Sequence, residues 1–288
     1  MPLSIAILVL LSAGLHPLWN LLIKKDPEPE AAFLTLSLLA AFVGLLHGLI
    51  TGADFFLTAD QFFFIAISVT GQLLYSLSLV ATLKRGDLSA YYPIIRASPV
   101  FIVGFSFFVL GKVYDWEVLV GIALVLFGAV LLLYRRGVNI FADWRIFLLA
   151  VLAMCGTGIY SLSDARLMKE IEPAVLFFWV QILVWPFLAI TYRLNGYTLP
   201  QYFGVTRIIR APMLHLKLIC CLYGSYLLIL MAYEQGGDVA AVTTVRQASI
   251  PLSVIIGGYF LNEGAIARRL IASFVLSVGI IIVIFTST

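Results

Sequence analysis

The sequence predicts an all-α, polytopic membrane protein with ten transmembrane helices that form two inverted five-helix repeats. The first observation behind this prediction is composition: of the 288 residues 62% are hydrophobic and 11% charged, and the mean hydropathy is +1.06. The second is an internal repeat. Residues 86–133 reappear without a gap 151 residues later, so that Gly86 aligns with Gly237 and Gly128 with Gly279. Two copies that each cross the membrane an odd number of times must lie upside down relative to each other, as in secondary transporters.

The apolar runs have the length of membrane-crossing helices, since a helix needs roughly 20 apolar residues to cross the hydrocarbon. A β-barrel would instead show alternating segments of about ten residues. With charged residues, Pro and Gly as boundaries, the predicted helices are 3–23, 31–51, 60–83, 88–111, 116–134, 146–168, 173–193, 215–235, 239–261 and 266–285. The two repeats are therefore assigned to residues 1–136 and 137–288, and the longest connection is 194–214.

Prolines and polar residues stand inside three of the apolar runs. In the first run Pro17, Trp19 and Asn20 interrupt the apolar sequence, no basic region precedes it, and Lys24 and Lys25 follow it, so we expect a retained first helix and not a signal peptide. Pro93 and Pro99 remove backbone donors from the fourth helix, and Pro251 does so in the ninth. Broken hydrogen bonding at this depth is typical of backbone that lines a cavity, and a plain packing kink is the alternative.

Lysine and arginine are unevenly distributed over the two sides of the predicted bundle. Thirteen fall on one side, whereas the other carries only Lys112, Arg166 and Lys169. The positive-inside rule places the rich side in the cytoplasm and both termini outside. We therefore expect a multi-pass protein of the plasma membrane, in a bacterium the inner membrane.

The ends of the two repeats carry a family resemblance. Each copy has an Asp-initiated helix, then a Leu-Gly-Lys or Leu-Asn-Glu turn ending at Lys112 or Glu263, then a last helix with a central Gly. Together with residues 16–20 (His-Pro-Leu-Trp-Asn) in the first helix, this resembles the drug/metabolite transporter superfamily, in its ten-helix EamA branch. The resemblance implies a metabolite transporter, and the chain departs from the pattern at Lys112, where the family often has an acid.

Two arginines lie inside corresponding predicted helices, Arg96 in the fourth and Arg246 in the ninth. They miss each other by one position in the repeat alignment, and inversion brings both toward the membrane midplane. A charge at the centre of a span costs from about 3 to more than 10 kcal/mol, so each needs a reason. Because guanidinium binds carboxylate or phosphate bidentately, we predict a central site for an anionic group. The alternatives are a neutralising protein partner or a water-filled groove.

The predicted substrate site extends to polar and aromatic residues near these arginines and in four other helices. Besides Arg96 and Arg246 its residues are Tyr92, Gln247, Ser98, Ser249, Trp19, Asn20, Tyr75, Tyr226 and Tyr160. Tyr92 lies four residues before Arg96 and shares its helix face, and Tyr75 aligns with Tyr226 at the repeat offset. For the aromatic residues, packing without substrate contact is the alternative.

His16 and Asp164 are the candidates for proton coupling. Histidine changes charge near neutral pH, although a buried, hydrogen-bonded neutral His16 is the alternative. Asp164 lies close in sequence to Arg166 and Lys169 at a helix end. The alternative to a titrating carboxylate is an ion pair of Asp164 with these basic residues at the membrane interface.

These features favour a secondary active transporter that exports a small polar or anionic metabolite, such as an amino acid or organic acid, by alternating access. The sequence has no Gly-x-x-x-x-Gly-Lys-[Ser/Thr], His-Glu-x-x-His or Gly-x-Ser-x-Gly motif, which disfavours an ATPase or an enzyme. The remaining alternative is a transporter or flippase for lysolipids or other lipids with a phosphate headgroup. We expect no cofactor, no catalytic or metal site and no nucleic-acid partner, and a monomer or homodimer in the lipid bilayer.

Overall fold

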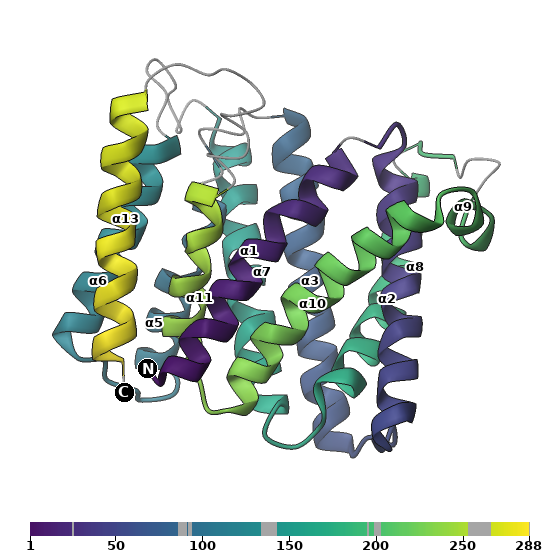
Figure 1. Ribbon diagram of the computed structural model, residues 1–288, viewed down its shortest axis with the longest axis horizontal. Helices are drawn as coiled ribbons and strands as arrows, with labels where there is room; N and C mark the ends of the chain where they lie inside the picture. Colours follow the sequence, from purple (N-terminus) through teal and green to yellow (C-terminus); the bar gives the residue numbers. More distant parts are fainter. Residues whose placement is uncertain are drawn as a thin grey trace.

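The computed structural model describes residues 1–24, 26–85, 91, 94–133, 143–194, 196–198, 203–252 and 266–287. Regular secondary structure in these residues is helical throughout, which confirms the predicted all-α class. The helices are α1 (Leu3–Lys24), α2 (Pro29–Thr51), α3 (Ala59–Arg85), α5 (Ser98–Phe108), α6 (Trp116–Leu133), α7 (Trp144–Leu167), α8 (Pro173–Leu194), α9 (Val205–Arg210), α10 (Pro212–Glu234), α11 (Val239–Val245), the 3₁₀ turn η1 (Arg246–Ala248) and α13 (Ile266–Thr286). Figure 1 shows a bundle of long helices with both chain termini at the same end.

Proline, aspartate and glycine mark several helix ends. Pro29 and Pro212 stand in the first turn of α2 and α10, where the missing N–H loses no hydrogen bond. The Asp143 carboxylate caps α7 by accepting from the backbone N–H of Arg145 at 2.9 Å. Gly52 ends α2 with φ +75°, a left-handed conformation that glycine adopts without steric cost.

The predicted helix boundaries agree with the structure within three residues except in the fourth and ninth helices. The fourth was expected to run unbroken over 88–111, but the backbone leaves the helix at Arg96 and α5 begins at Ser98. The ninth was expected over 239–261, but α11 ends at Val245 and η1 follows. The prediction of continuous helices at these two places was therefore wrong.

Local chemistry explains both interruptions. Pro99 lies in the first turn of α5 and lacks the N–H that a continuing helix would need. In the ninth helix, the Gln247 side chain donates from Nε2 to the carbonyl of Thr243 at 3.1 Å. That carbonyl is the acceptor for the Gln247 N–H in an unbroken α-helix, so the side chain competes with the backbone. A further difference is the short helix α9, which lies within the predicted connection 194–214.

Four helix pairs make the main contacts of the bundle, and each joins a helix before residue 134 to one after residue 142. The pairs are α3 with α7, α6 with α13, α1 with α10 and α2 with α8. Contacts within the first pair show its direction. Ser163 donates from Oγ to the carbonyl of Phe64 at 2.6 Å, whereas the earlier Gly156 lies against the later Tyr75. Helices α3 and α7 are therefore antiparallel, and Figure 1 shows the same for the other three pairs.

Small residues allow α6 and α13 to approach closely. A Cβ added to Gly121 would lie 2.7 Å from the Val283 side chain, and one added to Gly128 would lie 2.7 Å from the Leu276 backbone nitrogen. Gly279 on α13 is equally close to α6. These glycines thus allow two helices of the same chain to pack closely.

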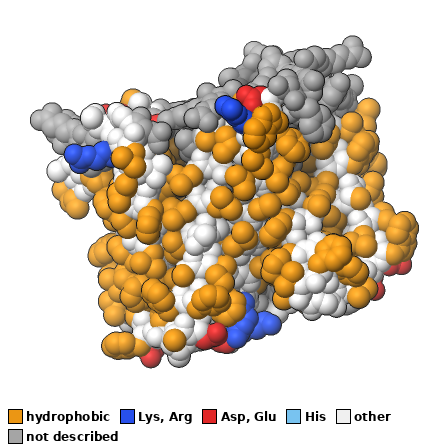
Figure 2. Space-filling model, turned by 180° about the vertical axis from the view of Figure 1, so that it is seen from behind, with side chains coloured by type: hydrophobic (Ala, Val, Ile, Leu, Met, Phe, Trp, Pro, Cys, Tyr) orange, Lys and Arg blue, Asp and Glu red, His pale blue; other side chains and the backbone are white. Residues whose placement is uncertain are grey.

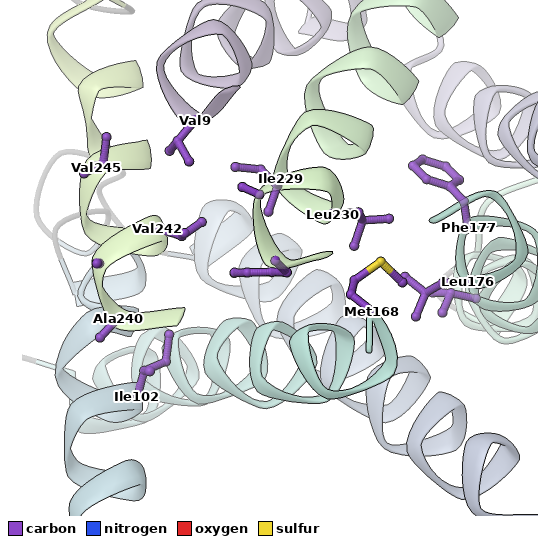
Figure 3. Packing of buried hydrophobic residues seen from close by; sticks show 14 of the residues in the cluster. Val9, Ile102, Met168, Leu176, Phe177, Ile229, Leu230, Ala240, Val242 and Val245 are labelled. Carbon is purple, nitrogen blue, oxygen red and sulfur yellow. The ribbon is translucent and has the colours of Figure 1, made fainter. Parts of the chain in front are cut away.

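The buried core and the apolar surface together fit a membrane protein. Figure 3 shows Val9 of α1, Ile229 of α10 and Val242 of α11 converging in the core, where each is at most 1% exposed. Large apolar side chains also cover the outside: Phe108 and Phe285 are 84% and 80% exposed. On the face seen in Figure 2, apolar side chains fill the middle, and the charged side chains visible lie near its edges. An apolar surface this extensive is suited to lipid and not to water.

Helix length leads to the same conclusion. Five helices are long and apolar enough to cross a membrane: Glu30–Thr51, Ala59–Leu79, Trp144–Leu167, Pro173–Leu194 and Pro212–Glu234. Shorter apolar helices are Leu3–Trp19, Ser98–Phe108, Trp116–Leu131 and Ile271–Thr286. The chain is a multi-pass membrane protein.

Candidate functional site

A cavity of about 140 Å³ lies where the two interrupted helices meet the rest of the bundle. Its lining contains many of the residues predicted for the substrate site. These are Arg96, Ser98, Arg246, Gln247, Trp19, Tyr75, Tyr160 and Tyr226, together with the coupling candidate His16. The long-range packing of α3 on α7 and of α1 on α10 brings these segments together.

Four predicted residues do not appear among the cavity-lining residues. Ser249 is fully buried and contacts the lining residue Arg96, and Asp164 is fully buried in contact with the lining residue Tyr226. Tyr92 and the side chain of Asn20 lie outside the described residues.

Arg96 joins the two interrupted segments. It stands at the break before α5, and its Nη2 donates to Ser249 Oγ at 2.6 Å. Its own carbonyl accepts from Gln247 Nε2 at 3.1 Å. The guanidinium is therefore positioned by a residue of the opposite half of the chain, while it still lines the cavity.

Arg246 opens η1 and faces the cavity from the second half. Its Nη2 lies 3.5 Å from His16 Nδ1, which also accepts from the Trp19 indole N–H at 3.3 Å. Because an indole N–H can only donate, Nδ1 must carry a lone pair and the imidazole is neutral in this arrangement. The guanidinium also lies over the Tyr226 ring, 5.9 Å from its centroid, a cation–π contact.

The charge of Arg246 has no carboxylate partner among the described residues. The ion pairs found there involve other basic residues, and Arg246 Nε is buried without a hydrogen-bond partner. A buried cation is costly unless something compensates it. The arrangement therefore suits an anionic group held in the cavity, where guanidinium N–H groups can donate to its oxygens.

Aromatic rings form one wall of the cavity. The ring centroids of Tyr75 and Tyr160 are 6.3 Å apart, and those of Tyr160 and Tyr226 are 6.4 Å apart, both in edge-to-face arrangements. Phe177 packs against Tyr226 at 5.6 Å. Such a wall can contact the apolar part of a bound metabolite while the arginines hold its charge.

Several lining residues were missed from the sequence. They are Phe33, Gln72, Ser76, Ile95, Thr157, Phe177, Gln181, Leu222, Ser225 and Thr243. Gln72 and Gln181 had a usable signal, since each is an amide inside an apolar run. Gln181 accepts from Ser37 Oγ at 2.7 Å. The small and apolar residues carry no such signal.

Asp164 forms no ion pair with any residue that the structure describes. Arg166, its neighbour in sequence, pairs with Glu170 at 2.5 Å and with Asp60 at 3.7 Å. The Asp164 carboxylate instead accepts hydrogen bonds from Ser68 Oγ at 2.5 Å and from the Tyr226 hydroxyl. The ion-pair alternative considered from the sequence was therefore wrong, because Asp164 points into the bundle.

A salt bridge joins the two halves outside the cavity, at the end of the bundle that carries the termini. Lys112, which follows α5, contacts the carboxylate of Asp238, the N-cap of α11. Partial burial lowers the pKa of Lys112, but the hydrogen bond and the charge of Asp238 outweigh it and raise the pKa above its usual 10.5. The lysine found where the resembled family often has an acid thus has an acidic partner.

Comparison with known proteins agrees with this architecture. The sequence model of the EamA-like transporter family matches residues 2–134. Twenty-nine chains of known structure match, among them a crystal structure that is 18% identical, covers 98% of this chain and 96% of its own, and has a TM-score of 0.76. At that identity the likeness shows the fold alone. No curated protein matches the chain.

An apolar helical bundle around a polar, arginine-lined cavity defines a class, the multi-pass membrane proteins with an internal polar site. The sequence of residues 2–134 matches the EamA-like transporter family. This match confirms the resemblance to the drug/metabolite transporter superfamily over the first half of the chain. The family match points to a transporter and not to an enzyme.

Proposed function

We propose that this protein is a secondary active transporter that exports a small polar or anionic metabolite, such as an amino acid or an organic acid. The observation that carries the proposal is the pair Arg96 and Arg246. The two guanidiniums come from the interrupted helices of the two halves and line one cavity. Guanidinium favours carboxylate and phosphate oxygens over neutral groups.

The proposal includes two inverted repeats, residues 1–136 and 137–288. Exchanging the halves replaces α1 by α7, α2 by α8, α3 by α10 and α6 by α13. The pair α3–α7 then becomes α10–α1, while α2–α8 and α6–α13 map onto themselves, so all four main pairs fit this exchange. In Figure 1, α1 and α3 run away from the terminus end, whereas α7 and α10 run toward it, which supports inversion.

Alternating access follows from such symmetry, because each half can adopt the conformation of the other around a fixed site. Ser98 corresponds to Ser249 at the repeat offset of 151 residues. Arg96 now donates to Ser249. Exchange of the two conformations would release this bond and let Arg246 donate to Ser98. Cysteines at positions 112 and 238, where Lys112 and Asp238 now join the two halves outside the cavity, can be connected by a short bifunctional cross-linker. Cross-linking should then hold the carrier in one state and stop transport, while the same variant without the linker transports. Unimpaired transport in the cross-linked protein would argue against this exchange.

Orientation and location complete the proposal. In the topology predicted from the sequence the two sides differ in Lys and Arg content, and the poorer side, with Lys112, Arg166 and Lys169, also holds both termini. By the positive-inside rule the richer end is cytoplasmic. We place the protein in the plasma membrane, the inner membrane of a bacterium, with both termini outside the cytoplasm.

The experiment is thermal stabilisation of the purified chain by L-phenylalanine, succinate, glucose 6-phosphate and lysophosphatidylcholine. We expect stabilisation by a soluble anion or amino acid. Losing a charged hydrogen bond costs about 1.5–3 kcal/mol, so Arg246→Gln should weaken that ligand by about 10- to 150-fold. Arg145→Gln is the matched control, because Arg145 is exposed at the start of α7. Stabilisation by the lysolipid alone would favour the lipid transporter, and equal affinity in Arg246→Gln would remove Arg246 from the site.

A further inference from the structure

Asp164 is a buried acid that the proposed binding of an anion does not use. It lies on α7, its side chain has no access to solvent, and it accepts from Ser68 Oγ on α3 and from the Tyr226 hydroxyl on α10. Among the described residues no Lys, Arg or His forms an ion pair with it. Burying a carboxylate without a cation is costly, and such a group can avoid the cost by binding a proton.

Tyr226 connects this carboxylate to the cavity. Its hydroxyl donates to Asp164, and its ring lines the cavity beneath the guanidinium of Arg246, 5.9 Å from the ring centroid. Phe177 and Tyr160 both pack edge-to-face against this ring and limit where it can move. A change of charge on Asp164 therefore reaches the cavity through one positioned side chain.

The titratable groups that interact with Asp164 among the described residues are Tyr226 and Tyr233 on α10, and Tyr160 on α7 interacts with both of these tyrosines. The cation Arg246 on η1 lies over the ring of Tyr226. From α3 the contact is the hydroxyl of Ser68, which does not titrate near neutral pH. Tyrosine ionises near pH 10, so below that pH a proton taken up in this cluster is held by the carboxylate.

We propose that Asp164 is the proton-binding site of the carrier and that Tyr226 links its protonation to anion binding at Arg246. Its role in transport rests on the proposed function. A proton forms an O–H bond on one carboxylate oxygen of Asp164 when the cavity opens to one side, and it returns to water on the other side. Nothing else is consumed.

The sign of the coupling follows from the charges. An ionised Asp164 repels an anion in the cavity, and an anion in turn favours a protonated Asp164, because linkage is reciprocal. Proton and anion therefore bind together and cross together. For a singly charged acid the step is electrically neutral, and the concentration gradient of that acid can drive its export.

The first test uses no substrate. Infrared absorption of protonated carboxyl groups is recorded on the purified full chain as the pH is lowered. We expect a band that Asp164→Asn removes and Asp60→Asn retains, since Asp60 is an exposed acid on α3. In Tyr226→Phe, which keeps the ring but loses a donor to the carboxylate, the band should appear at a higher pH. Absence of an Asp164-dependent band at every pH where the protein stays folded would overturn the proposal.

The second test measures linkage with sulfate, an anion that carries no titratable proton near neutral pH. If sulfate binds together with one proton on Asp164, the affinity for sulfate should fall about tenfold for each unit by which the pH rises above the pKa of Asp164. This slope should disappear in Asp164→Asn and persist in Asp60→Asn. A slope that survives in Asp164→Asn, or proton release on sulfate binding, would overturn the proposal. Failure of sulfate to bind at any pH counts against the anion site of the proposed function, and the infrared band then decides on Asp164 alone.

Discussion

Gly156 is the position where one added methyl group tests the packing of the bundle. It lies in the antiparallel contact of α7 with α3, where a Cβ would come within 2.5 Å of the Tyr75 nitrogen and 2.7 Å of the Gly71 carbonyl oxygen. Both atoms belong to the backbone and cannot rotate away, so Gly156→Ala must separate the two helices. Overpacking of this kind costs about 1–3 kcal/mol, and we expect the upper end. Replacing a helical Gly by Ala returns about 1 kcal/mol, which leaves a net loss of roughly 2 kcal/mol.

Gly104→Ala is the matched control for this prediction. Gly104 lies in α5, and nothing lies within 4 Å of the position that its Cβ would take. This variant should gain up to about 1 kcal/mol from helix propensity. The two variants should therefore differ by about 3 kcal/mol in the free energy of unfolding in detergent, followed by tryptophan fluorescence. Equal stability would refute the close approach of α3 and α7 described above.

Three further predictions concern other contacts. Gly128→Leu should destabilise the α6–α13 contact by about 3 kcal/mol or more, because a Cβ there already meets the Leu276 backbone at 2.7 Å; the measurement is detergent unfolding, and wild-type stability would contradict it. Arg207→Gln should cost about 1–3 kcal/mol, because the largely buried carboxylate of Asp26 loses the cation that it pairs with and keeps the backbone N–H of Glu28 as a hydrogen-bond donor. An unchanged melting temperature would show that this ion pair contributes nothing. The pKa of Lys112 is raised in the folded state. The stabilisation from its salt bridge to Asp238 is therefore present below pH 10.5 and is lost as the pH rises through the higher pKa of the folded state. In Lys112→Met, melting curves should show a smaller decrease in melting temperature at alkaline pH.

Most of the fold was predictable because most membrane helices correspond to one continuous apolar stretch of the sequence. Helix α8, for example, begins and ends within one residue of its prediction. The interruption at Gln247 could not be predicted in the same way. It depends on the Gln247 side chain, which donates a hydrogen bond to the carbonyl of Thr243. The sequence does not show whether a glutamine makes this bond or leaves the carbonyl to the backbone N–H of an unbroken helix. Helix α9 was also missed, because Arg207 pairs there with carboxylates of the distant segment between α1 and α2.

The site was predictable where burial is expensive. Arg96 and Arg246 were found because a guanidinium inside an apolar run demands a reason. The environment of Asp164 was not predictable, since its sequence neighbour Arg166 suggested a surface ion pair, whereas the structure turns Asp164 toward Ser68. Closeness in sequence was therefore misleading here, because the direction in which Asp164 leaves its helix determines which side chains it contacts.

The two arginines are not equivalent, although they come from corresponding helices. Arg96 is held by Ser249 and gives its carbonyl to Gln247, so protein contacts position it before any ligand arrives. The contacts of the Arg246 guanidinium with described residues include the Tyr226 ring and the neutral His16, and no carboxylate among those residues forms an ion pair with it. Its desolvation cost is therefore the less compensated of the two, and an anion in the cavity relieves more of it. Because a ligand that binds only the folded state stabilises that state, the energy that makes Arg246 costly in the empty carrier is available for binding the anion.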